Sequence, residues 1–390
     1  MAATDLNDAQ ARSAAPAWAG SLVLAALALP GVLPSSALAE EAPEKTTLNT
    51  KLLLYQDSQP GLTRVRVFAP SLQMIKPLNP HWSLEGSAVL DSVSGASPRA
   101  YTSVSSASHM EDHRVGLDGK LTHYADRSAW SFGAALSKEE DYQSTALSGD
   151  ARFSSADNNT TWNVGLGFSN DRIDSSNGVV NGEKKRVTEV MGGVTQAWSP
   201  RDLVQLNLTY TQGRGYYSDP YKFPDNRPRS RDQSILLMRW NHHVENWGDT
   251  LRTSYRYYSD TFGIKAHTLG EEWVHPVNER WTVTPALRYY SQSSAKFYVD
   301  PEINASGDAI FPTALMANLP ANYSGDQRLS AFGAVTLGLK LGYKLDSEWS
   351  GDFKLEQYEQ RSNWRLGGQG SPNIAAFHAT SLQFGVSRRF

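Results

Sequence analysis

The densest group of potential metal ligands is the segment His109-Met110-Glu111-Asp112-His113. In an extended strand alternate side chains share a face, so His109, Glu111 and His113 would point the same way. Two imidazoles and a carboxylate suit Zn, Ni or Fe. A polar loop where it meets a strand gives the same pattern, and polar clusters are common in loops. We therefore expect a solvated loop, with no metal and no cofactor.

Hydrolase signatures are missing from the sequence, which contains no G-x-S-x-G elbow, H-E-x-x-H helix or P-loop. Ser94, Ser97, His109 and Asp112 have the types that a membrane-embedded lipase or protease uses, but these types are common. The adjacent pair His242-His243 would point to opposite faces of a strand and share no metal. We expect a protein without enzymatic activity.

Composition excludes several classes of function. The 390 residues include no Cys, which removes disulfides, thiolate metal sites and Cys nucleophiles. The net charge of −3 is too balanced to indicate nucleic-acid binding. Aromatic residues reach 11%, with 11 Trp and 17 Tyr, while apolar residues make up only 40%. This combination suits a thin apolar surface band edged by aromatic rings.

The N-terminus predicts export. Residues 17–29 are almost continuously small or apolar, and Ala37-Leu38-Ala39 precedes Glu40. This is the pattern of a signal peptide over residues 1–39, with cleavage after Ala39. Arg12 is the only basic side chain before the apolar run, and a start codon placed too far upstream would explain that. Residues 40–390 would then be the mature domain.

Strict alternation of apolar with polar or small residues marks the mature chain. It runs through residues 162–169, 203–210 and 335–345, with Leu203 as an exception. Short polar breaks near residues 77–80, 125–128, 156–159, 199–202, 245–249, 276–279 and 345–348 alternate with mostly longer connections, three of which are short, around Gln59, Glu140 and Phe262. Short turns at one end and longer loops at the other are typical of bacterial outer-membrane barrels.

Segment counting gives about sixteen strands, an even number that places both termini on the short-turn, periplasmic side. Tryptophans cluster near the short turns, as an interfacial girdle would require: Trp82, Trp130, Trp162, Trp198, Trp247, Trp281 and Trp349. The last strand alternates and ends on the aromatic Phe390, which resembles the signal that the barrel assembly machinery recognises. The sequence therefore predicts an all-β, antiparallel, up-and-down transmembrane barrel in the cell outer membrane, in contact with lipid and lipopolysaccharide.

If the apolar side of each strand faces lipid, a set of charged side chains faces the lumen. The set comprises Arg64, Arg66, Arg114, Lys120, Arg252, Arg256, Arg288, Lys340 and Lys344, with Glu85, Asp91, Asp118, Asp352 and Glu356. A basic ladder along a water-filled path would favour anions. Equally, the charges would pair across the lumen and only hold the barrel's shape. The mixed charges of the 213–230 loop would bind lipopolysaccharide phosphates, form a constriction or pair internally, and we expect internal pairing.

Several motifs resemble an uncharacterised bacterial family of exported proteins known by a domain-of-unknown-function label. They are Asp91-Ser92-Val93-Ser94-Gly95-Ala96-Ser97-Pro98, the segment Ser218-Asp219-Pro220-Tyr221-Lys222, the segment Ser254–Tyr258 and the segment Leu287–Ser293. The resemblance implies an outer-membrane barrel. Members of that family are often found beside small lipoproteins, thioredoxin-like proteins and flavin transferases, which implies a link to envelope redox or cofactor maturation. The resemblance implies no catalytic residues.

Two functions remain in contention, with a third behind them. The first is a pore or export barrel for small polar solutes, with anions as one class, because about sixteen strands leave a lumen wide enough for water. The second is a non-conducting anchor or assembly partner for periplasmic redox or flavin-related proteins, with a plugged lumen. An outer-membrane hydrolase trails both. An open lumen would favour the first function over the second.

Overall fold

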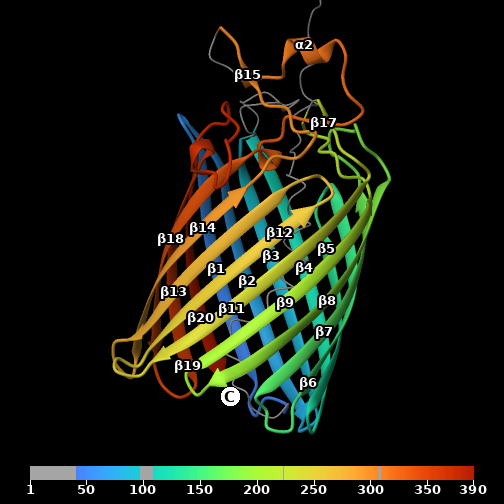
Figure 1. Cartoon of the computed structure of the whole chain (residues 1–390). Helices are drawn as coiled ribbons and strands as arrows, with labels where there is room; N and C mark the ends of the chain where they lie inside the picture. Colours follow the sequence, from blue (N-terminus) through green and yellow to red (C-terminus); the bar gives the residue numbers. More distant parts are fainter. Residues whose placement is uncertain (1–40, 97–108, 223, 306–308) are drawn as a thin grey trace, which may run out of the picture.

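The computed structural model describes residues 41–96, 109–222, 224–305 and 309–390. The predicted signal peptide over residues 1–39 and Glu40, the first residue of the predicted mature chain, lie outside the described residues. Within the described part, sixteen strands form one closed antiparallel barrel, as the alternation predicts (Figure 1). The strands are β1 (Thr47–Gln59), β2 (Leu62–Asn79), β3 (Trp82–Ala96), β4 (His109–Ala125), β5 (Ser128–Lys138), β6 (Tyr142–Ser154), β7 (Thr160–Ile173), β8 (Glu183–Ser199), β9 (Asp202–Gly215), β11 (Ser230–Val244), β12 (Asp249–Asp260), β13 (Lys265–Pro276), β14 (Trp281–Gln292), β18 (Phe332–Lys344), β19 (Trp349–Arg361) and β20 (Phe377–Arg389).

Closure occurs between the first and last strands. Residues 47–58 of β1 pair with residues 378–389 of β20 in continuous register. Beyond the strand ends, Phe390 and Thr46 exchange both backbone hydrogen bonds at 3.0 Å. Closure satisfies the backbone groups that an open sheet would leave unpaired in lipid.

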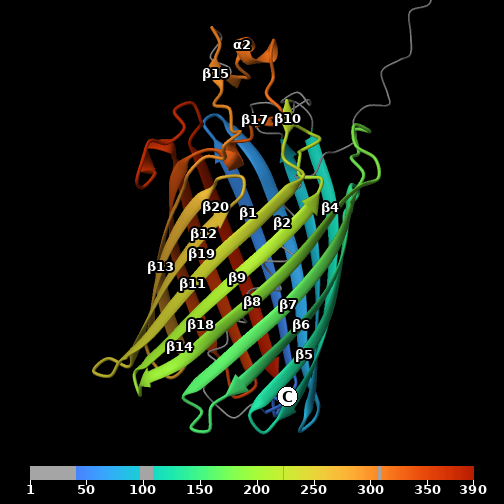
Figure 2. The ribbon, with the colours of Figure 1, turned by 45° about the vertical axis from the view of Figure 1, so that its right-hand side comes forward.

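The two ends of the barrel differ as expected. At the end that carries the C-terminus, the turn end, seven connections of two to five residues join neighbouring strands. At the other end, the loop end, the connections of residues 174–182, 216–229, 293–331 and 362–376 are longer, and Figure 2 shows them rising above the strands. They contain β10 (Asp225–Asn226), β15 (Glu302–Ile303), β16 (Ala309–Ile310), α2 (Thr313–Met316), β17 (Tyr323–Ser324), η1 (Gln327–Leu329) and η2 (Ser362–Trp364).

Large apolar side chains cover the outside of the barrel. Phe132, Leu147, Leu208 and Leu337 are each more than half exposed. The girdle tryptophans near the turn end are exposed as well, with Trp198 at 72%. On β19 and β20, the rings of Phe353 and Phe384 pack at 5.1 Å across the outer face. A soluble protein would not leave so large an apolar band in water.

The larger buried apolar cluster of the described residues lies at the loop end. Tyr258, Phe262, Ile264, Ala295 and Leu329 belong to it, and all are less than a tenth exposed. Ala295 and Leu329 come from the 293–331 loop, whereas the others belong to β12 and the β12–β13 turn. The long loop therefore packs against the barrel wall.

Candidate functional site: the lumen wall and the mouth network

The inner face of each strand is the one opposite to the exposed apolar side chains. By this alternation most of the expected lumen residues lie on the inner face, namely Glu85, Asp91, Arg114, Arg252, Arg256, Arg288, Lys340 and Lys344. Lys120, Asp118, Asp352 and Glu356 share this face.

Of the two arginines of β2, only Arg66 lies differently from the expectation, whereas Arg64 faces inward, over the ring of Phe377 on the inner face of β20. Arg66 alternates in step with the exposed Phe68 and therefore falls on the outer face. The register between β1 and β2 shifts at Gln56/Ser58, which changes the facing of the residues beyond it. Arg64 is buried at this irregularity, with its Nε 3.9 Å from Oδ1 of Asp57. Neither arginine belongs to an open basic ladder.

The wall formed by β3 and β4 is electrically paired. The Nζ of Lys120 lies 2.7 Å from Oε2 of Glu85, and the Nη2 of Arg114 lies 2.5 Å from Oδ2 of Asp91. The hydroxyl of Ser87 donates to Asp118. On this side of the lumen, cations and carboxylates largely neutralise one another.

The opposite wall, from β11 to β18, is different. Arg256 and Arg288 form no ion pair with any described carboxylate: Arg256 lies over the Tyr258 ring at 5.4 Å, and Arg288 donates to the Thr336 hydroxyl at 3.2 Å. Arg252 has only a loose partner, Glu272, at 3.6 Å. Because Arg stays charged at any working pH, this wall carries uncompensated positive charge.

Arg239 also lies on the same inner face, on β11, although the sequence pattern does not predict it. Its strand carries Leu236, Leu237 and Met238 in succession. Apolar side chains on both faces hide the alternation there, and only the pairing with β9 and β12 assigns the facing.

A network of six charged side chains crosses the loop end, and we call it the mouth network. It joins the 216–229 and 293–331 loops through Asp219, Lys222, Asp225, Arg227, Asp326 and Arg328. Its three cations and three carboxylates balance. The internal pairing expected of the 213–230 loop is found for Arg227 with Asp225, but Lys222 pairs with the other loop.

Asp326 is the centre of the mouth network. Its fully buried carboxylate accepts from Lys222 at 2.8 Å, Arg227 at 2.7 Å and the Nε of Arg328 at 2.7 Å. These cations hold the pKa of Asp326 well below its usual range despite burial. Arg328 also donates to Asp219 at 2.6 Å, and the two carboxylates raise the pKa of Arg328. Such burial is stable only because every charge is paired and hydrogen-bonded.

Hydrogen bonds extend the mouth network around the rim. The Tyr221 hydroxyl donates to Asp141 of the β5–β6 connection at 2.6 Å. Next to Asp326, the Gln327 side chain accepts from Gln59 of the β1–β2 hairpin at 3.0 Å. In the strand order, the β1–β2, β5–β6, β9–β11 and β14–β18 connections are spaced at quarter-turns around the ring. The described loops therefore tie together four sides of the barrel mouth.

Two of the motifs that carry the family resemblance meet at this place. Asp219, Tyr221 and Lys222 of the Ser218–Lys222 motif are in the mouth network or bonded to it. Gln292 of the Leu287–Ser293 motif donates to the backbone oxygens of Arg328 and Ser330. Of the Asp91–Pro98 motif, Asp91 pairs with Arg114, and the part from Val93 onward lies outside the described side chains.

The metal and hydrolase candidates gain no support from the described residues. The side chains of His109 and Glu111 lie outside them, and His113 is exposed. Among the described side chains no cluster of His, Asp or Glu is arranged to hold a metal. His242 and His243 occupy opposite faces, with His242 bonded to Asp202 on the outer face.

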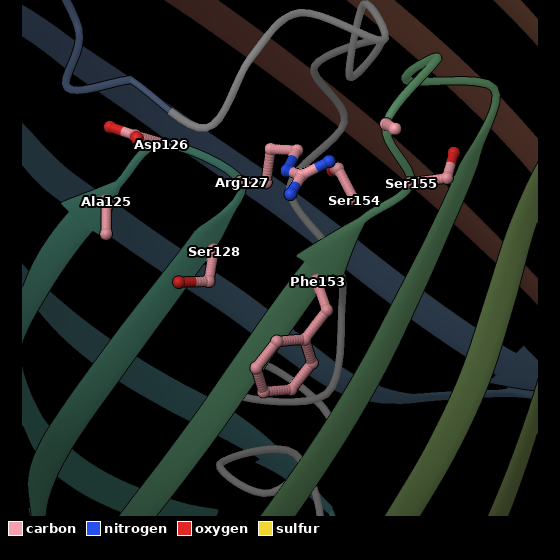
Figure 3. Close-up of a pocket in the computed structure, with 8 residues that line it drawn as sticks. Ala125, Asp126, Arg127, Ser128, Phe153, Ser154 and Ser155 are labelled. Carbon is pink, nitrogen blue, oxygen red and sulfur yellow. The ribbon is translucent and has the colours of Figure 1, made fainter.

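A shallow pocket of about 640 Å³ lies between the β4–β5 and β6–β7 turns (Figure 3). It is lined by Asp126, Arg127, Ser128, Phe153 and Ser154 among others, with no histidine in its lining. Within the part of the chain that the structure describes, none of the helices has the length and apolar character needed to cross a bilayer.

Comparison with known proteins places the chain in a family and in a fold class. The model of a family described as "Protein of unknown function (DUF3570)" matches residues 19–183 and 175–381. No curated protein matches the sequence. A bacterial polysaccharide outer membrane secretin superposes with a TM-score of 0.51 at 10% identity, over 88% of this chain and 98% of that chain.

Two further solved structures come from Pseudomonas aeruginosa. The siderophore receptor PirA from Pseudomonas aeruginosa gives a TM-score of 0.47 at 10% identity over 88% of this chain, and the chain spans 62% of that receptor's length. A Pseudomonas aeruginosa FadL homologue gives 0.39 at 11% identity, over 89% of each chain. At 10% identity the similarity to the secretin is one of fold alone.

Proposed function

The chain belongs to the DUF3570 family, whose function is unknown, and we propose that this member is an outer-membrane channel for small anionic solutes. The apolar outer band and the tryptophan girdle support location in a membrane. The predicted signal peptide over residues 1–39 supports export. Short turns would then face the periplasm, with the mouth network on the extracellular side.

The observation that carries the proposal is the uncompensated charge on one wall. Arg256 and Arg288 face the lumen without an ion pair among the described residues, and Arg252 has only a loose one. Charges in a confined space with low-dielectric walls raise the local concentration of the opposite ion. A lumen whose opposite wall is neutralised by its own pairs would therefore attract anions to the β11–β18 side.

Planar-bilayer recordings test this proposal. In a salt gradient the reversal potential of the purified barrel should indicate chloride passing in preference to potassium. Replacing Arg252, Arg256 and Arg288 together with Gln should shift it toward cation selectivity. The matched control changes Lys120→Gln and Glu85→Gln, which removes a neutral pair and should leave selectivity unchanged. A conducting barrel indifferent to the triple replacement would contradict the assigned role of these arginines.

The mouth network favours a second candidate function. Loops tied across the mouth suit a barrel that does not conduct but anchors periplasmic proteins, such as the thioredoxin-like proteins or lipoproteins that the family resemblance implies. Conductance separates the two functions. If neither the wild type nor a variant with a severed mouth network conducts, the anchoring function replaces the channel.

A further inference from the structure

Two clusters of identical composition lie on the outer face at the turn end. In the first, Asp202 begins β9 and lies directly opposite His242 of β11. The Trp240 Nε1 and the His242 Nδ1 approach the same Oδ1 of Asp202, at 2.9 Å and 2.8 Å. The carboxylate thereby fixes one indole and one imidazole side by side.

The second cluster repeats this arrangement on the next pair of strands. Asp249 begins β12, and its carboxylate bonds the Trp273 Nε1 at 2.6 Å and the His275 Nδ1 at 2.7 Å, both from β13. In each cluster Trp and His are separated by one residue and face an Asp at the start of the neighbouring strand. The Trp247 ring stacks on Trp273 at 6.0 Å.

The hydrogen bonds determine what each histidine offers to a ligand. A carboxylate only accepts, so Nδ1 donates and the Nε2 of the neutral ring is left as an acceptor. No described residue forms a hydrogen bond with Nε2 of His242 or His275, and their side chains are 34% and 48% exposed. The indole faces and the nearby carboxylate both attract a cation. The site therefore suits a cation that carries N–H donors, which is a primary ammonium.

The clusters lie where a lipid headgroup would be. Trp240, Trp247 and Trp273 are 39%, 65% and 40% exposed and mark the edge of the apolar outer band. We propose that the two clusters, which we call the turn-end clips, bind the ammonium of phospholipids with an ethanolamine headgroup. This inference rests on the proposed membrane location but is independent of transport.

Native mass spectrometry of the full barrel in detergent, titrated with phosphatidylethanolamine or phosphatidylglycerol, tests the proposal. The wild type should retain phosphatidylethanolamine in preference. A double variant, His242→Phe and His275→Phe, keeps the rings but removes the acceptors, so it should retain about threefold to tenfold less. The matched control is His123→Phe, because the rings of His123 and Trp82 lie 4.6 Å apart on the outer face, and no described carboxylate forms a hydrogen bond with His123. This control should leave retention unchanged.

If the histidine variant folds poorly, a second variant, Asp202→Asn with Asp249→Asn, tests the same proposal. It removes the negative charges and should also weaken retention. Equal retention of both lipids by the wild type would overturn the proposal, as would equal losses in the double variant and the His123 control. Conductance measured on the same samples reports separately on the channel, so failure of one proposal is distinguishable from failure of the other.

Discussion

At the scale of single residues, the mouth network depends on Asp326. Removing its carboxylate in Asp326→Ala would leave Lys222, Arg227 and Arg328 facing one another without their shared acceptor. Breaking a buried ion pair in this way costs about 3–5 kcal/mol. We expect the 216–229 and 293–331 loops of the variant to become sensitive to trypsin while the strands stay folded.

Glu183→Gln is the matched control for Asp326→Ala. It removes the pair with Arg229, which is 61% exposed, and exposed pairs contribute only about 0–1 kcal/mol. Its cleavage pattern should match the wild type. If Asp326→Ala is cleaved no faster than this control, the loops are held by other contacts, such as the packing of Leu329 against Phe262.

At the scale of elements, β18 provides a test of which face meets lipid. Leu339 is 40% exposed on the outer face, between Pro285 of β14 and Leu355 of β19. Leu339→Arg should lower the free energy of unfolding in vesicles by roughly 2–4 kcal/mol, because the charge would enter the apolar band. Gly338→Arg faces the lumen near Glu356 and should avoid that cost apart from crowding against Ala286. If urea titration measures equal losses for Leu339→Arg and Gly338→Arg, the facing assigned to β18 is wrong.

The barrel elements follow from the sequence, but the site follows only in part. The turns and the strand number were predicted because alternation is local: Val335 to Leu345 specifies one strand by itself. Arg66 is predicted on the wrong face because Val65 and Val67 on either side of it are apolar, whereas the pairing of β1 with β2 keeps Arg66 in step with the exposed Phe68. The mouth network was missed because Arg328 and Asp219 are 109 residues apart and lie in segments without periodicity. Ion pairs between loops require the folded barrel to bring them together.

At the scale of the whole molecule, assembly and conduction depend on the two ends of the barrel. Phe390 exchanges backbone hydrogen bonds with Thr46 at the turn end, where the first and last strands close the barrel, and is 52% exposed. Deleting Phe390 should sharply lower the amount of barrel in the outer membrane, because it removes the predicted assembly signal. Quantitative immunoblots of membrane fractions measure this effect. Unchanged levels would contradict the role assigned to the C-terminus.

The loop end offers a reversible test of conduction. The chain has no Cys, so Gln59→Cys with Gln327→Cys creates a single reactive pair where the two side chains now form a hydrogen bond. Joining the thiols with a short cleavable cross-linker should reduce the channel's conductance, and a reductant should restore it. Each single Cys variant is the control. If the conductance is the same with and without the cross-link, the solute path lies away from this contact.

The tie between four sides of the mouth also has a mechanical consequence. A ring of strands resists stretching along its hydrogen bonds but flattens easily into an oval, since flattening needs only small changes at each strand. Contacts between loops on different sides of the mouth, such as Tyr221 with Asp141, Lys222 with Asp326 and Gln59 with Gln327, oppose this flattening. Lateral pressure from the bilayer on the outer wall would thus load the salt bridges of Asp326, and any rupture of those bridges would let the barrel change its cross-section along its whole length.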